Sequence, residues 1–141
     1  MTGKSSLQQL LVDVVADGVG YRKLVQLLED QFAAALRLDA ARLGTLAGAI
    51  AAEVDAIDLR RRYRIERLGE GPGAVLALGR RLLAGDRHAK QRALFVDCCA
   101  EVKALAARCR ALTRRNSGLL VAQYEAMWRL IHGERHTYVP A

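Results

Sequence analysis

The residues that could bind a metal ion are few and poorly placed for it. His132 and His136 are four residues apart, a spacing that lets two imidazoles on one helix share a metal ion. Gly133 lies between them, and the sequence places no third ligand nearby. Solvent-exposed histidines at a helix end are therefore the favoured interpretation, and the sequence predicts no metal and no other cofactor.

The cysteines do not form a disulfide framework. Cys98, Cys99 and Cys109 are odd in number, and two of them are adjacent. Neighbouring residues on one helix point about 100° apart, which suits neither a bridge nor a shared metal ion. We therefore expect reduced thiols.

Groups for acid–base or nucleophilic catalysis also lack a supporting pattern. The carboxylates of Asp55 and Asp58 are explained by a solvated helix face, and the glycines of 69–73 do not match a phosphate-binding loop. No serine has a histidine or an acid at a suggestive spacing. The sequence predicts a protein that is not an enzyme.

Composition indicates an all-α fold. Of the residues, 52% are apolar, but these are mostly Ala and Leu, and only 5% are aromatic. Ala, Leu and Arg are the strongest helix formers, and β-branched residues are scattered. The net charge of +7 raises nucleic-acid binding as an alternative. Acidic residues separate most of the basic groups, so we do not favour it.

Apolar periodicity and breaking residues predict four helices. The first covers about 5–38, with a kink or short break at Gly18 and Gly20; the second follows an Asp39 N-cap and has arginines near its C-terminus. The clearest break is 69–73, after which a short helix over 74–84 ends at Gly85. A long helix over about 87–131 then ends at Gly133.

The long helix carries a heptad seam, in which apolar residues alternate at four and three residues with Asn116 as a polar member. Its members are Cys98, Val102, Leu105, Cys109, Leu112, Asn116, Leu119, Gln123, Ala126 and Leu130. A second edge of Leu120, Tyr124, Met127 and Ile131 widens the apolar face.

Helices of 30 to 45 residues span roughly 45–65 Å, too long to fold into a sphere at this chain length. We therefore expect an elongated, antiparallel, coiled-coil-like helical bundle. It forms one domain over 1–131, with a break near 69–73 and a flexible C-terminal tail over 132–141. No uncharged apolar run approaches the ~20 residues of a membrane span, and the N-terminus does not resemble a signal peptide. The sequence predicts a soluble, cytoplasmic protein.

The sequence of the long helix resembles that of a known protein family. The stretch from Leu112 through Asn116, Ser117, Gly118, Leu119 and Leu120 to Gln123, followed by Leu130 and by Thr137-Tyr138, resembles the FlgN family of flagellar type III export chaperones. The N-terminal half is similar to the family's leucine-rich helix, acidic pivot and arginine-bearing second helix, at 24–36, Asp39, Leu43, Leu46, Ile50 and Arg61.

The resemblance implies a bacterial cytoplasmic chaperone. Such proteins bind the C-terminal amphipathic helix of hook–filament junction proteins and deliver them to the export gate. By position, contact with the cytoplasmic domain of the gate falls on Tyr138. Helix-in-groove recognition assigns client binding to these residues: Leu105, Leu112, Asn116, Leu119, Leu120, Gln123, Met127 and Leu130. Before Leu112, packing of the seam on the chain's own helices is favoured. A non-enzymatic coiled-coil oligomerisation protein is the alternative.

Overall fold

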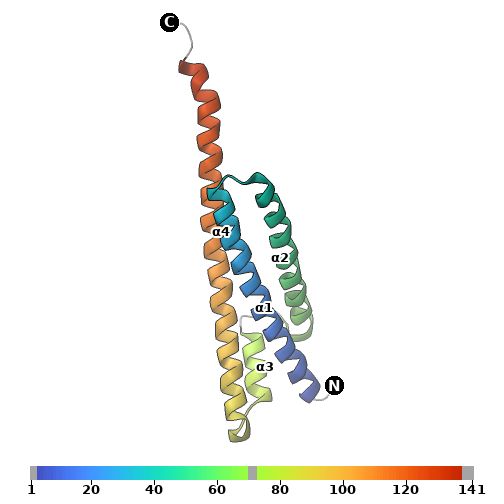
Figure 1. Ribbon diagram of the computed structural model, residues 1–141. Coiled ribbons are helices and arrows are strands. Elements are labelled where there is room, and N and C mark those ends of the chain that lie inside the picture. The colour runs from blue at the N-terminus through green and yellow to red at the C-terminus, as the bar shows by residue number, and fades with distance from the viewer. Residues whose placement is uncertain (1–2, 70–72, 138–141) are drawn as a thin grey trace.

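The computed structural model describes residues 3–69 and 73–137, and within these ranges the regular structure is entirely helical. Helix α1 (Gly3–Leu36) is followed by α2 (Ala40–Leu68), the short α3 (Ala74–Leu82), a 3-10 turn η1 (Asp86–His88) and α4 (Ala89–Thr137). Figure 1 shows an elongated bundle in which α4 runs the whole length. Its 49 residues span about 74 Å at 1.5 Å per residue. The predicted all-α, elongated fold is confirmed.

The helix ends follow from local hydrogen bonding. After α1 the Asp39 amide donates to the Ala34 carbonyl at 3.0 Å, with Leu38 in a left-handed conformation at φ 55°. The Asp39 side chain then accepts from the Arg42 amide at 3.0 Å, as the predicted N-cap of α2 requires. Gly69 and Gly85 have positive φ at the ends of the second and third segments, where a side chain would be strained.

Helices α1 and α4 pack side by side in the same direction. Cys109 donates to the Tyr21 carbonyl, Asn116 to that of Leu28, and Gln123 to that of Ala35, always across 88 residues. A constant offset means two parallel helices in register, as in a parallel coiled coil. The predicted seam of α4 is therefore the face that α1 covers.

Helix α1 lies at the centre of the bundle. It packs against α4 on one side and against the antiparallel α2 on the other, whereas α2 and α4 share no comparable contact. Short α3 packs against α1 and α4 at the end of the bundle where α4 begins. There Leu10, Val14, Leu83 and Phe95 form one buried cluster, and a second cluster around Leu24 and Leu28 lies further along α1.

Three glycines behave differently from the prediction. Helix α1 continues unbroken through Gly18 and Gly20. Gly20 lies where α2 approaches α1 closely: a Cβ there would lie 2.7 Å from Arg60 Nη2. Likewise α4 does not end at Gly133, as the sequence predicts, but continues to Thr137. A helical glycine costs about 1 kcal/mol, which a long helix tolerates where no left-handed turn forms.

Gly79 of α3 provides a test of packing at the bundle end. Its backbone contacts Phe95 so closely that a Cβ would lie 2.1 Å from Cε1 of that ring. We expect Gly79→Ala to lower the free energy of unfolding by about 1–3 kcal/mol, because the buried ring must move. Gly48→Ala is the matched control: nothing lies within 4 Å of the new Cβ, so helix propensity should stabilise it by up to about 1 kcal/mol. Thermal melts of both variants check this, and equal melting temperatures would contradict it.

Over the ranges that the structure describes, none of the helices combines the length and the apolar character needed to cross a membrane.

Candidate helix-binding groove

The first seam of α4 is used within the chain. Asn116 is buried, and its Nδ2 donates to the Leu28 carbonyl and to Gln31 Oε1, both at 2.8 Å. Leu112 packs against the cluster of Leu24 and Leu28, and Gln123 donates to the last turns of α1. Asn116 and Gln123 therefore set the register of α1 on α4, and their side chains face α1 and not the groove.

A second seam on α4 is defined by two rows of residues spaced by seven. Because a helix nearly repeats after seven residues, members of a row share a face. One row is Val96, Lys103, Arg110, Ser117, Tyr124 and Ile131, and the other is Cys99, Ala106, Thr113, Leu120 and Met127. The rows alternate at three and four residues, as two helices packed along a seam require. In the described chain none of these residues is buried, although Cys99 packs against the buried cluster at the α3 end of the bundle.

The second seam borders an open groove between α2 and α4, with α1 as its floor. A cavity of about 600 Å³ is lined by Tyr21 and Leu24 of α1, Val54 and Ile57 of α2, and the second-seam residues Ala106, Arg110 and Thr113. Nearer α3, a cavity of about 570 Å³ is lined by Val14, Val75 and Leu76, and by Val96, Cys99 and Lys103 of the second seam. Both cavities therefore lie along one continuous wall of α4.

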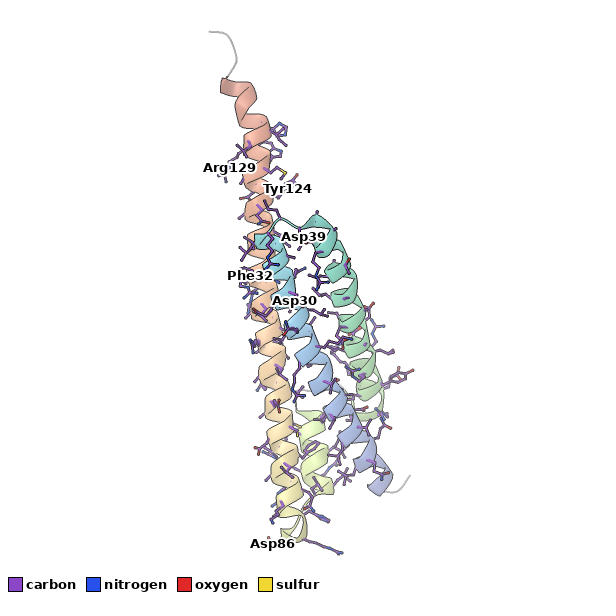
Figure 2. All side chains as sticks on the ribbon, in the orientation of Figure 1. Asp30, Phe32, Asp39, Asp86, Tyr124 and Arg129 are labelled. Atoms are coloured by element: carbon purple, nitrogen blue, oxygen red, sulfur yellow. The ribbon has the colours of Figure 1, made fainter. Side chains whose placement is uncertain are left out.

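Beyond Gln123 the second seam continues onto the overhang, which we define as residues 124–137 of α4. Figure 2 shows Tyr124 and Arg129 on the part of α4 that extends past the α1–α2 connection at Asp39. Its large apolar side chains are more than half exposed: Tyr124 71%, Met127 59%, Trp128 53%, Leu130 68% and Ile131 59%. So many exposed apolar residues on adjoining turns are typical of a binding surface.

The α2 wall is held to α1 by ion pairs that are largely removed from solvent. Asp17 is buried and accepts from Arg60 Nε at 2.9 Å and pairs with Arg64 Nη1 at 2.5 Å. One turn earlier, Asp13 is also buried and pairs with Arg67 Nη2 at 2.7 Å. Arginines at 60, 64 and 67 share one face of α2, and their ion pairs join the C-terminal half of α2 to α1 beside the groove.

A phenol and two thiols that line the groove are neutral at neutral pH. Burial, and then the nearby Asp17 carboxylate, raise the pKa of the Tyr21 phenol. Burial also raises the pKa of the Cys109 thiol, against a smaller opposing effect of Arg108 and Arg110. Burial, followed by neighbouring Cys98, does the same for Cys99. The Tyr21 phenol and the Cys99 and Cys109 thiols therefore add no charge to the lining of the groove.

Side chains for metal or acid–base chemistry are not gathered in this groove. In the described ranges no three His, Cys, Asp or Glu side chains are grouped to hold a metal ion. His132 lies against Trp128 with ring centroids 4.3 Å apart, while the His136 side chain lies outside the described part of the chain. The arrangement is suited to binding an elongated amphipathic partner.

The predicted client-binding residues divide into two groups. Leu105, Leu112, Asn116, Leu119 and Gln123 belong to the first seam, whose partner is α1. Leu120 lies on the second seam and is half-buried, while Met127 and Leu130 are exposed on the overhang. Tyr138 lies outside the described residues.

Four residues missing from that prediction belong to the same surface: Val121, Tyr124, Trp128 and Ile131. Tyr124 and Ile131 belong to the second apolar edge that the sequence predicts, whereas Val121 and Trp128 do not. Only the position of α1 shows that this edge is the open one.

Comparisons of the chain with protein families, with curated proteins and with solved structures gave no match.

Proposed function

We propose that the protein is a non-enzymatic chaperone that holds an amphipathic helix of a client protein along the second seam of α4. The observation that carries the proposal is the second seam itself. It has the heptad spacing of a helix-packing face, yet none of its members is buried in the described chain, and α2 stands apart across a groove. A client helix lying there would add a fourth long helix to α1, α2 and α4.

The resemblance to flagellar export chaperones supplies the identity of the client in this proposal. The client is the C-terminal amphipathic helix of a hook–filament junction protein, and the chaperone delivers it to the type III export gate in the bacterial cytoplasm. An elongated groove is suited to that task, since it covers the apolar face of a helix that would otherwise associate prematurely.

Calorimetric titration with C-terminal peptides of the junction proteins from the same genome tests the proposal. We expect one peptide to bind one chain, with a negative heat-capacity change from burial of apolar surface. Sedimentation of the free chain is the companion measurement. A tight homo-oligomer that binds no such peptide would instead support the oligomerisation alternative, with a second copy on the overhang.

Gate docking makes a separate prediction for Tyr138. We expect Tyr138→Ala to leave the melting temperature and peptide affinity unchanged, while binding to the cytoplasmic domain of the gate weakens by about tenfold, because a docked tyrosine buries a large area. Tyr124→Ala is the control: because Tyr124 lies on the overhang, this variant should bind the peptide more weakly and the gate domain normally. Normal gate binding by Tyr138→Ala, or a melting temperature several degrees lower, would show that this assignment is wrong.

A further inference from the structure

The middle of the second seam carries positively charged side chains, whereas its end on the overhang is apolar. Lys103 and Arg110 occupy consecutive positions of one row, seven residues apart, and each lines one of the two groove cavities. Arg114 lies one turn beyond Arg110 and also lines the cavity nearer the overhang. All three side chains belong to exposed residues of a single wall of the groove.

These three cations have no carboxylate partner among the residues that the structure describes. Nine ion pairs are formed there, and none includes Lys103, Arg110 or Arg114. The acids that also line the cavities are already paired. Asp17 is held by Arg60 and Arg64, and Asp58 by Arg61 and Arg62 at 3.5 and 2.9 Å.

An apolar helix would therefore bury part of this row without neutralising it. Covering unpaired cations removes them from water, which is unfavourable unless the partner supplies opposite charge. Carboxylates on the partner would form ion pairs and would also attract it to a chain of net charge +7. The overhang, by contrast, exposes large apolar and aromatic side chains, those of Tyr124, Met127, Trp128, Leu130 and Ile131.

We propose that the partner is an acidic amphipathic helix, with carboxylates facing Lys103, Arg110 and Arg114 and an apolar segment on the overhang. This inference rests on the proposed helix-binding function and adds the charge pattern of the partner. A nucleic acid is the less favoured ligand of the same row, because the described lining offers a single aromatic ring, Tyr21, for base stacking and places the Asp17 carboxylate below Lys103.

Two synthetic amphipathic peptides of about four heptads test the charge pattern. Both peptides carry the same apolar residues along the seam. The positions beside the seam, in the middle of the peptide, are Glu in one peptide and Lys in the other. We expect the Glu peptide to bind about tenfold more tightly at low salt, with a difference that shrinks as salt screens the pairs. Equal affinities would overturn the inference and leave helix binding standing, whereas failure of both peptides to bind would overturn both proposals.

Charge reversal on the chain completes the experiment. The variant Lys103→Glu/Arg110→Glu/Arg114→Glu should invert the preference, so that the Lys peptide binds more tightly. The control Arg87→Glu/Lys90→Glu/Arg108→Glu changes net charge equally at exposed positions outside both cavities, and should keep the preference for Glu. Circular dichroism confirms that both variants are folded. The inference would be overturned if both variants lost affinity for the Glu peptide to the same extent. It would also be overturned if duplex DNA displaced the Glu peptide from the unmodified chain and the first variant alone no longer bound the DNA.

Discussion

Replacing Asp17 with alanine is expected to lower the free energy of unfolding by about 3–5 kcal/mol, because it removes the shared partner of two arginines. The Asp17 side chain is 6% exposed and bridges Arg60 and Arg64, whose side chains are only 26% and 17% exposed. Without it, two guanidinium groups remain between α1 and α2 with no opposite charge at Asp17. The polar atoms Arg60 Nη2 and Arg64 Nη1 already lack a well-aligned hydrogen bond.

Asp58→Ala is the matched control for this cluster. Asp58 also bridges two arginines, Arg61 and Arg62, but it does so within α2 at a more exposed position. Its loss should cost less than about 0.5 kcal/mol, as for other exposed pairs on one helix. Chemical denaturation of both variants measures the difference. If the two variants unfold at the same denaturant concentration, the Asp17 cluster does not hold α2 against α1.

Truncating the overhang is expected to weaken client binding at least a hundredfold with little effect on stability. In the variant Tyr124→Ala/Met127→Ala/Ile131→Ala, each truncation removes about 1–3 kcal/mol of contact with a bound helix. The three side chains are 59–71% exposed, so the free chain loses little packing, and alanine favours the helix. Calorimetry with the client peptide and a thermal melt measure the two effects.

The control for the overhang removes apolar surface elsewhere. Val12, Val15 and Val19 are 57–61% exposed on α1 and line neither groove cavity. The variant Val12→Ala/Val15→Ala/Val19→Ala should bind the client as the unmodified chain does. A similar loss of affinity in both variants would mean that binding follows general hydrophobicity and not the second seam.

The sequence predicts individual helices well because their signals are local. The break near 69–73, the Asp39 cap and the three–four alternation around Asn116 each depend on residues within a few turns. Periodicity also identifies Asn116 as a seam residue. It does not identify the helix that packs there, because a heptad face suits any partner of matching spacing.

Local sequence patterns could not predict the interactions between residues that are far apart in the sequence. Asp17 lies on an apolar stripe, and its role depends on Arg60 and Arg64 on another helix. Gly20 resembles a helix breaker until the approach of Glu53, Ile57 and Arg60 shows that it lies in a close contact between α1 and α2. The same holds for the candidate site: the second edge of α4 is visible in the sequence, but its exposure follows from α1 covering the first seam.

Hydrogen exchange of the chain, with and without the client peptide, tests helix binding along the second seam most directly. The backbone amides of 124–131 belong to a helix without a neighbour in the described chain, so they should exchange rapidly when the protein is free. We expect the peptide to slow their exchange strongly, and to slow exchange around Arg110 and Val54 on the two groove walls. Unchanged exchange over 124–131 at saturating peptide, with protection confined to the outer face of α1 or α2, would contradict the account.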